Sequence, residues 1–439
     1  MKRYETYKNS GIKWLGEIPS HWDVKRLKAV ISEHFSGCWG EDEKHDGYDR
    51  LCIRIADFNF ETQSVSSTAS TYRHYNDKQI VSCTLKDNDL LLEKSGGGDK
   101  TPVGRVVVYK KNDNNEDLFA NFCECLRVRK GHSPQFIAYL LKVVYIKTMM
   151  RQYYKQTTGL QNIDIPDYLG MKIILPPLAE QEAIVAFLDE KTGEIDGLVS
   201  QVEREIELLK EYKQAEIARV VTKGLNPDAP MRPSGISWIG DIPAHWELKT
   251  LRNFLKIISD KGHPEEQLLS VVREQGVIIR DIESQDENHN FIPDDLSGYK
   301  LVKIGQFAIN KMKSWQGSYG VSAYQGIVSP AYYVCELNFG NKQFFNEAIR
   351  SKVYVPFFTQ YSKGIRVGQW DLSPIGLKSI PFIEPPLEEQ QEIVDYIDRK
   401  TTEIDRLVVE LTYQVEYLKE YKQRLIADVV TGKINVQPN

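Results

Sequence analysis

The sequence predicts an α+β protein in which two mixed α/β domains in tandem are separated by two long helices. Three observations predict this fold. The chain repeats part of its own sequence, each repeat contains a long heptad pattern, and the segments between the repeats hold short strand-like runs. The expected boundaries are 1–175 for the first domain, 176–224 for a central helical spacer, 225–384 for the second domain and 385–439 for a C-terminal helical spacer.

A short motif opens each half of the chain. Residues 10–22 read S-G-I-K-W-L-G-E-I-P-S-H-W, and residues 234–246 read S-G-I-S-W-I-G-D-I-P-A-H-W. Over 10–27, 11 of 18 positions are identical at an offset of 224 residues. The histidine–tryptophan pairs, His21-Trp22 and His245-Trp246, could form sites, but we expect them to pack a turn at the start of each domain.

A longer repeat follows each domain. Residues 176–224 match residues 385–433 at 27 of 49 positions, with an offset of 209 residues. The intervening stretches, 28–175 and 252–384, share little sequence. Repeated segments that enclose dissimilar stretches suggest a scaffold that presents two different recognition surfaces.

The longer repeat predicts helices with a heptad seam. Pro176-Pro177 forbids helix before Leu178, and the first helix is expected to run to about Thr222. Gly224 closes the first helix and Gly432 the second. Apolar residues recur at steps of four and three, at Ile195, Val199, Val202, Ile206 and Leu209 in the first copy and at Ile404, Val408, Leu411, Val415 and Leu418 in the second.

Two such seams pack most simply on each other, as an antiparallel coiled coil with a domain at each end and pseudo-twofold symmetry. The alternative is that each helix packs separately on its own domain. The stretch 192–222 would span roughly 46 Å as a helix. The two helical segments carry net charges of −5 and −4 within a total of −5, so the rest of the chain carries +4. That balance is compatible with phosphate binding by the variable domains.

The variable domains are predicted to be mixed α/β. Strand-like runs occur at 90–92, 103–109, 126–128, 307–309 and 331–334, and helical stretches at 133–150 and 344–359.

Polar loops after these strands are candidate DNA contacts, because glycine admits a phosphate, lysine neutralises it, and amides or hydroxyls read base edges. Each loop could instead be a plain surface turn or a mobile polar loop. The 94–101 loop lacks the spacing of a Walker A motif. The first-domain candidates are Lys94, Ser95, Gly97, Lys100, Thr101, Arg105, Tyr154, Lys155, Thr157, Thr158 and Gln161, and the second-domain candidates are Lys311, Lys313, Ser314, Gln316, Lys363, Arg366 and Gln369.

The composition predicts where in the cell the protein is located and argues against one kind of metal site. No apolar run is long enough to span a membrane and the first residues are unlike a secretory signal, so we expect a cytoplasmic protein. The six cysteines include no C-x-x-C pair, which argues against a zinc ribbon or finger. Cys123 and Cys125 are expected to be reduced thiols on one face of a sheet.

The repeated W-[LI]-G-[ED]-I-P-x-H-W, P-P-L-x-E-Q-x-x-I-V and D-x-K-T-x-E-I-D motifs resemble those of the specificity subunits of type I restriction–modification systems. The resemblance implies two target-recognition domains, each reading one half of a bipartite, asymmetric site in double-stranded DNA, with helices that fix the gap. It also implies partners: two methylation subunits that use S-adenosylmethionine, and in some systems two restriction subunits that use ATP and Mg²⁺. This subunit itself is expected to bind no cofactor or metal.

The sequence agrees with a non-catalytic role. The segments 175–178 and 384–387 lack the ends of the [DNS]-P-P-[YF] motif of amino-methyltransferases, and no Walker A loop occurs. Residues 293–295, Pro-Asp-Asp, lack the Glu-x-Lys partner of a nuclease site. Two other classes remain as alternatives: an enzyme with an unrecognised site, and a coiled-coil scaffold that binds proteins but not DNA.

Overall fold

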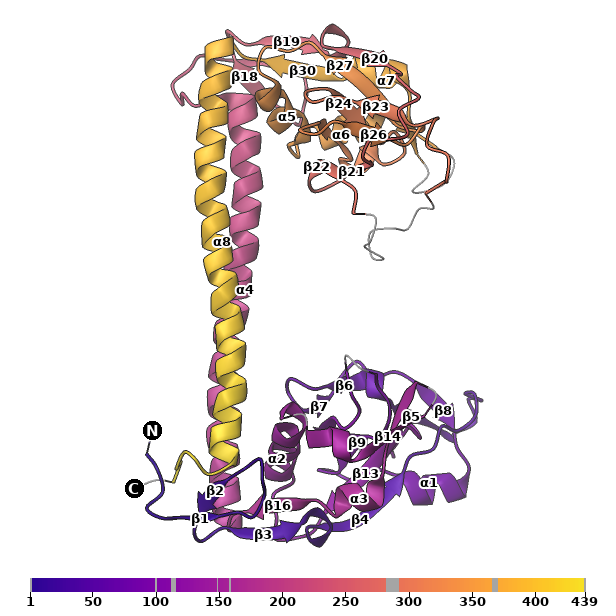
Figure 1. Cartoon of the computed structure of the whole chain (residues 1–439), viewed down its shortest axis with the longest axis vertical. Coiled ribbons are helices and arrows are strands. Elements are labelled where there is room, and N and C mark those ends of the chain that lie inside the picture. The colour runs from indigo at the N-terminus through magenta and orange to yellow at the C-terminus, as the bar shows by residue number, and fades with distance from the viewer. Residues whose placement is uncertain are drawn as a thin grey trace. The chain divides into compact units, whose positions relative to one another are not determined.

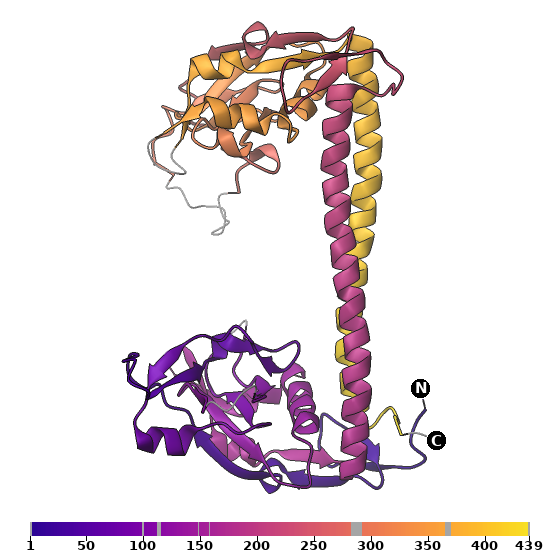
Figure 2. The ribbon, with the colours of Figure 1, turned by 180° about the vertical axis from the view of Figure 1, so that it is seen from behind.

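The computed structural model describes residues 2–98, 101–111, 116–147, 149–157, 159–281, 292–364 and 370–437, without the side chain of residue 157. The chain divides into two compact units. Unit 1 comprises Met1–Gln201 and Gln414–Asn439, and unit 2 comprises Val202–Tyr413. The division falls within the long helices α4 (Leu178–Lys223) and α8 (Leu387–Val430), so each helix contributes one part to each unit (Figures 1 and 2).

The domain of unit 1 is built on a six-stranded sheet with the strand order β4-β13-β9-β11-β7-β6. The strands are β4 (Ile31–Ser36), β13 (Cys123–Val128), β9 (Leu90–Glu93), β11 (Val106–Val108), β7 (Ser64–Val65) and β6 (Phe58–Asn59). A smaller sheet joins β12 (Leu118–Phe119), β5 (Asp49–Ile53) and β8 (Tyr72–His74), and the helices are α1 (Asp77–Cys83), α2 (Pro134–Ile146) and α3 (Ile165–Leu169). Cys123 and Cys125 are buried free thiols in β13, as the sequence predicted, and the other four cysteines are free as well.

The domain of unit 2 has a four-stranded sheet with the strand order β20-β27-β24-β25. The strands are β20 (Leu255–Ile258), β27 (Tyr333–Leu337), β24 (Phe307–Ile309) and β25 (Tyr319–Val321). Two antiparallel pairs accompany it, β21 (Leu269–Val272) with β22 (Gly276–Ile279) and β23 (Lys300–Val302) with β26 (Gly326–Val328). The helices are α5 (Lys342–Arg350), α6 (Val355–Tyr361) and α7 (Pro374–Ser379).

Several predicted elements need correction. The expected helix over 344–359 is two helices, because Ser351 adopts an extended backbone after α5 and its hydroxyl donates to the Ala348 carbonyl at 2.7 Å. The run 103–109 shortens to β11, since Gly104 has a φ of +115° that a strand residue does not adopt. The run 331–334 is displaced to β27. The runs 90–92, 126–128 and 307–309 are confirmed as strand.

The repeated motifs form the frame of each unit. In unit 1, β3 (Asp23–Arg26) pairs with β16 (Lys172–Leu175), and in unit 2, β19 (Glu247–Thr250) pairs with β30 (Pro381–Glu384). Trp22 and Trp246 are buried, so the predicted packing role of these tryptophans is confirmed. The preceding histidines have a further role that the sequence did not predict: His21 contacts Glu180 at 2.8 Å, and His245 contacts Glu389 at 2.5 Å.

A repeated glutamine joins each long helix to a helix of its domain. The Gln181 side chain donates to the Pro176 carbonyl and accepts from the Ser133 backbone N–H, at the start of α2. Its counterpart Gln390 makes the equivalent bonds to Pro385 and Asn341, at the start of α5. Both glutamines are buried. The conserved P-P-L-x-E-Q segment therefore fixes a variable domain to its helix in the same way twice.

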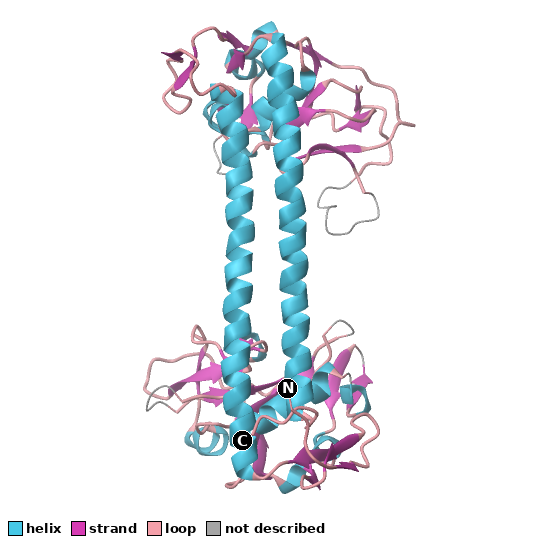
Figure 3. Cartoon of the chain, turned by 90° about the vertical axis from the view of Figure 1, so that its left-hand side faces the viewer, coloured by secondary structure: helices cyan, strands magenta, loops and turns pink. Residues whose placement is uncertain are grey.

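The long helices pack on each other, so the alternative of separate packing was wrong (Figure 3). In unit 1, Lys422 of α8 contacts Asp196 of α4, and in unit 2, Lys213 of α4 contacts Asp405 of α8. Both pairs require antiparallel helices in the same register. All ten predicted seam residues are buried or half-buried, at Ile195, Val199, Val202, Ile206, Leu209, Ile404, Val408, Leu411, Val415 and Leu418.

The helix ends also follow the sequence. Gly224 and Gly432 have left-handed φ values of +74° and +77°, which an L residue adopts only with strain. The Gly224 N–H donates to the Val220 carbonyl at 3.0 Å and so closes α4. Among the described residues, every helix is too short or too polar to cross a lipid bilayer.

Candidate nucleic-acid interface

The two candidate loops of the first domain form one surface. Strand β15 (Leu160–Ile163) pairs with β10 (Ser95–Gly96) on one side and with β14 (Tyr154–Thr157) on the other. The Ser95 hydroxyl lies 2.5 Å from the Asn162 side-chain oxygen. We call the described residues of 94–101 and 153–162 the first loop surface. Long-range pairing brings these two stretches together, although they lie more than fifty residues apart in sequence.

The residues of the first loop surface differ in how far they are exposed to solvent. The Lys155 side chain is 77 % exposed and contacts Asp164 at 2.9 Å, and Thr101 is exposed. Tyr154 and Ser95 are half-buried. Gly97 has a φ of +57°, and a Cβ there would crowd the Thr101 carbonyl, so glycine is required by the turn.

Gln161 and Lys94, two of the predicted contacts of the first domain, are engaged within the protein. Gln161 is buried and its side-chain oxygen accepts from the Val103 N–H at 3.1 Å, so it supports the loop from inside. Lys94 contacts Glu124 at 3.1 Å. Burial acts to raise the pKa of Glu124, but hydrogen bonds from its polar neighbours, Lys94 included, outweigh burial and lower the pKa.

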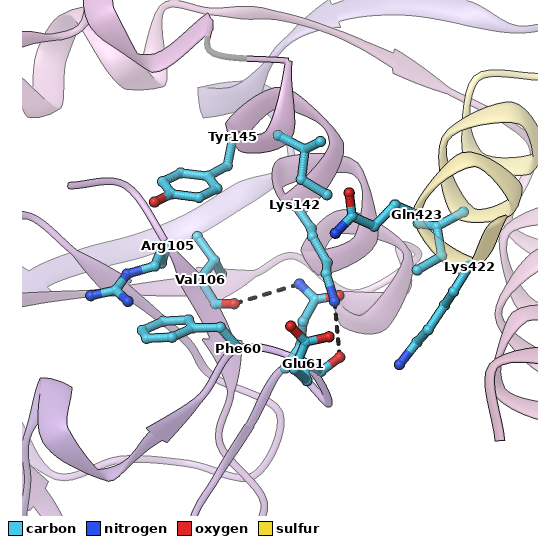
Figure 4. A pocket seen from close by; sticks show the side chains of 11 residues that line it. Phe60, Glu61, Arg105, Val106, Lys142, Tyr145, Lys422 and Gln423 are labelled. Carbon is cyan, nitrogen blue, oxygen red and sulfur yellow. Dashed lines mark hydrogen bonds between the residues drawn. The ribbon is translucent and has the colours of Figure 1, made fainter. Parts of the chain in front are cut away.

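Arg105 lies away from the first loop surface, in a small pocket (Figure 4). Its guanidinium forms two hydrogen bonds to Glu93, at 2.7 and 2.8 Å, and lies 3.8 Å from the centre of the Phe60 ring. The same pocket holds Lys142, whose ammonium donates to the Glu61 carbonyl at 2.9 Å. Arg105 therefore stabilises the domain, and phosphate contact would require it to leave a buried carboxylate.

The second domain also joins its two candidate loops. Strand β28 (Ser362–Lys363) pairs with β29 (Asp371–Leu372), and the Leu372 N–H donates to the Lys311 carbonyl at 3.1 Å. The Thr359 hydroxyl donates to the Trp315 carbonyl at 3.2 Å. We call the described residues of 311–318 and 358–372 the second loop surface. Each domain thus combines two separate stretches into one polar surface.

Lys313 and Lys363 are exposed on the second loop surface, and Gln316 is half-buried. Lys311 contacts Asp371 at 3.0 Å. Ser314 is fully buried, and its hydroxyl lies 3.4 Å from that of Ser362, so its place is inside the loop rather than at a ligand. Lys100, Thr158, Arg366 and Gln369 lie outside the described residues, as does the side chain of Thr157, and their predicted contacts stay predictions.

The structure adds residues that the sequence reasoning missed. The rings of Trp315 and Trp370 lie 5.1 Å apart on the second loop surface, and each is half-buried. Burial lowers the pKa of Lys300, and the positive charges of the nearby Lys261 and Lys311 lower it further. This repulsion identifies a locally positive region beside Lys311. In the sequence, the signal that could have identified these residues was the presence of lysines and aromatic residues next to the predicted strands and loops.

Metal chemistry finds little support among the described residues. Glu43, His45 and Asp49 have ligand atoms within 4.8 Å of one another, but Glu43 and His45 are exposed on a surface loop. Asp49 already accepts hydrogen bonds from the backbone N–H groups of Lys44 and His45. Hydrogen bonds within this surface loop explain why the three side chains lie close together. The two loop surfaces offer instead exposed ammonium groups, hydroxyls and amides, the groups that contact phosphates and base edges.

Comparisons with known proteins agree with this geometry. Residues 19–208 match the family model for the type I restriction modification DNA specificity domain. The type I restriction enzyme MjaVIII specificity subunit of Methanocaldococcus jannaschii is 24 % identical over 445 residues, covering 96 % of this chain and 94 % of that protein. The EcoKI specificity subunit of Escherichia coli is 23 % identical over 375 residues, covering 80 % of this chain and 76 % of that protein.

Solved structures show the same fold. The HsdS subunit of Thermoanaerobacter tengcongensis has a TM-score of 0.53 at 14 % identity, covering 95 % of this chain and 98 % of that one. A chain from a type I R-M system, solved to explain complex assembly and conformational transition, has a TM-score of 0.66 at 13 % identity and covers 95 % of this chain and 99 % of its own. Together with the repeated motifs and the paired long helices, these matches show that the chain is similar to the specificity subunits of type I restriction–modification systems over nearly its whole length, and that residues 19–208 match their DNA specificity domain.

Proposed function

We propose that this chain reads a bipartite, asymmetric site in double-stranded DNA, one half through each loop surface. The observation that carries the proposal is that each domain joins two separate polar stretches into one surface, on a frame that is repeated almost unchanged. Because the two loop surfaces differ while the segments that hold them are repeated, each loop surface would read a different half-site. In this proposal the chain acts as a specificity subunit and is non-catalytic, and catalysis lies in its partner subunits.

Exposed cations support phosphate contact. Lys155, Lys313 and Lys363 present ammonium groups at the two loop surfaces. The contact of Lys155 with Asp164 is largely exposed, and water and salt screen such ion pairs, so a phosphate can replace the carboxylate. Gln316 and Tyr154 supply polar groups for base edges. We infer that α4 and α8 then fix the gap between the half-sites, because neither helix is interrupted between its bounds.

The long helices also offer surfaces for partner subunits. In unit 2, Leu208 and Tyr212 of α4 are about half exposed, as are Val409 and Tyr413 of α8. Residues four apart share one face of a helix, so each pair forms an apolar strip. In unit 1, Tyr417 and Tyr421 of α8 repeat this arrangement. We propose that two methylation subunits dock here, with restriction subunits where the system has them.

The cofactors belong to those partners in this proposal. Methylation subunits would bind S-adenosylmethionine, and restriction subunits would bind ATP and Mg²⁺. This chain would hold none of them and would act only by placing its partners on DNA. An assay of the chain alone with S-adenosylmethionine or with ATP and Mg²⁺ should therefore show neither methylation nor cleavage.

The test is single-molecule mapping of adenine methylation in genomic DNA from cells that express the cognate methylation subunit with and without this chain. We expect a gapped, two-part adenine motif that appears only when the chain is present. A variant with Lys155, Lys313 and Lys363 changed to alanine serves as control and should assemble but methylate poorly. If the complex assembles with the unaltered chain and no new motif appears, the protein-binding scaffold is the better explanation.

A further inference from the structure

An open pocket of about 440 Å³ lies on the first domain, beside the first loop surface. The indole of Trp39 and the ring of Phe122 line it, over the small side chains of Ala56 and Ala120. Asn121 and Arg54 contribute its polar groups, and two nitrogens of the Arg54 guanidinium donate to the Asp57 carboxylate at 3.3 and 3.2 Å. The lining contains one guanidinium, one amide and no carboxylate. This combination suits a flat, uncharged ligand that has polar groups along its edge.

Trp39 is exposed even though its backbone is firmly held. A Cβ at Gly37 would overlap the carbonyl oxygens of Phe119 and Ala120, so the chain approaches that strand as only glycine permits. The Cys38 N–H donates to the Phe119 carbonyl at 2.9 Å. The Arg73 guanidinium lies 4.7 Å from the centre of the Trp39 ring and donates to the Trp39 carbonyl at 3.2 Å. Nevertheless 42 % of Trp39 is exposed.

Phe122 is exposed in a comparable way, at 49 %, on the turn that begins at Ala120. The Cys123 N–H donates to the Ala120 carbonyl at 3.0 Å and closes this turn. Two exposed aromatic rings around one hollow are unusual for a surface without a ligand, because each exposes apolar area to water. The pocket therefore points to a partner with aromatic faces.

The pocket is joined directly to the first loop surface. The backbone N–H groups of Lys94 and Ser95 both donate to the Phe122 carbonyl, at 3.0 and 3.2 Å. DNA that contacts Ser95 would pass the mouth of the pocket. Within a duplex both faces of a base are covered by its neighbours, so a base reaches an aromatic pocket only after it leaves the stack.

We propose that this pocket is a nucleobase-binding subsite, which takes one base out of the stack of the DNA bound at the first domain and holds it against Trp39 and Phe122. The base is distinct from the adenine that the partner subunit methylates, and the inference rests on the proposed DNA-reading function. Asn121 and Arg54 supply hydrogen-bonding groups to its edge. In the second domain Trp315 and Trp370 contact each other instead, so their rings cover one another.

The test uses the full complex and duplexes that contain the mapped motif. A tetrahydrofuran abasic residue is placed opposite each base of the first-domain half-site in turn, because an unpaired base leaves the stack more readily. We expect one position, apart from the methylated adenine, where the unpaired base tightens binding by about tenfold. Trp39→Ala should abolish that gain and weaken binding to the intact site roughly tenfold or more, while Trp39→Phe retains part of both.

Tyr72→Ala is the matched control, since Tyr72 is 48 % exposed in the same domain and does not line the pocket. It should bind every duplex as the unaltered complex does. Sequence-specific methylation that persists in Trp39→Ala would show that DNA reading stands independently of the pocket. The subsite is excluded if no position tightens binding, or if the gain persists in both Trp39→Ala and Phe122→Ala. Equal weakening of every duplex by Trp39→Ala, with no favoured position, would also overturn it.

Discussion

The Lys422 ammonium of α8 donates to both carboxylate oxygens of Asp196 of α4, at 2.7 and 2.8 Å. Only 7 % of the Lys422 side chain is exposed, whereas Asp196 is 49 % exposed. A lysine side chain this buried depends on its partner, because without the carboxylate its ammonium would keep only part of its hydration. This contact therefore fixes the register of the two helices within unit 1.

Asp196→Ala should destabilise the protein more than Asp405→Ala. Loss of Asp196 leaves a buried charge without its partner, which costs about 1–3 kcal/mol. Asp405 is 59 % exposed opposite Lys213, and such a pair contributes about 0–1 kcal/mol. Thermal unfolding should therefore show a fall in Tm of about 3 °C or more for Asp196→Ala and a smaller one for Asp405→Ala. Equal falls would mean that Lys422 finds another partner.

Lys142 should give the protein a distinctive alkaline pH dependence. Burial, followed by the nearby Lys422 charge, lowers the pKa of Lys142 to about 8, below the roughly 10.4 of an unfolded chain. Between these values the unfolded chain binds more protons, so this group makes the folded state more stable as the pH rises from about 8 to 10.

Lys142→Met removes that contribution while filling a similar volume. The difference in free energy of unfolding between the unaltered protein and the variant, measured by urea denaturation, should rise in favour of the unaltered protein between pH 8 and 10. Because all other titrating groups are shared, they cancel in the difference. A difference that stays constant with pH would contradict the assignment to Lys142.

Gly432→Ala should be more harmful than Gly16→Ala. Both glycines have left-handed φ values, of +77° and +75°, so an alanine costs about 1 kcal/mol at either position. A Cβ at Gly432 would in addition overlap the Pro19 ring and lie 3.1 Å from the Trp22 ring, whereas no heavy atom lies within 4 Å of a Cβ at Gly16. Urea denaturation should show a larger fall in midpoint for Gly432→Ala. Similar urea midpoints for the two variants would show that the turn at Pro19 shifts to admit the Cβ without loss of stability.

Exchange of one variable domain should change one half of the recognised site. Residues 28–175 lie between repeated segments whose contacts to the domain, through Gln181 and Ser133, have close equivalents in the second half. A chain carrying the 28–175 segment of a relative should therefore keep the half-site read by its second domain. Methylation mapping of the hybrid checks this. A change in both halves would argue against independent reading.

Matched insertions in the long helices should change the gap alone. Seven residues inserted after Glu203 of α4 and after Val415 of α8 keep the heptad seam in phase and lengthen it by about 10.5 Å. At about 3.4 Å per base pair, the gap should grow by about 3 base pairs. Methylation mapping should show both half-sites unchanged. An unchanged gap would mean that the helices do not set it.

Periodic and repeated features were predictable because they are local. The steps of four and three among Ile195, Val199 and Val202 predict a seam wherever the helix lies, and the proline and glycine positions predict its ends. The structure confirms the bounds of α4 closely. The break after Arg350 escaped prediction, since a serine that adopts an extended backbone has no strong periodic signal.

The sequence by itself determined the frame, namely the repeats, the long helices with their apolar seams, and the positions of the polar loops, and the structure decided that the two helices pack on each other. Only the tertiary structure decided which loop side chains reach solvent, because exposure depends on neighbours far along the chain. Gln161 and Ser314 look like contact residues in sequence, yet Val103 and Ser362 hold them inside. Conversely no motif in the sequence singles out Trp39 or Phe122, and long-range packing around Phe119 and Lys94 leaves them exposed around one pocket.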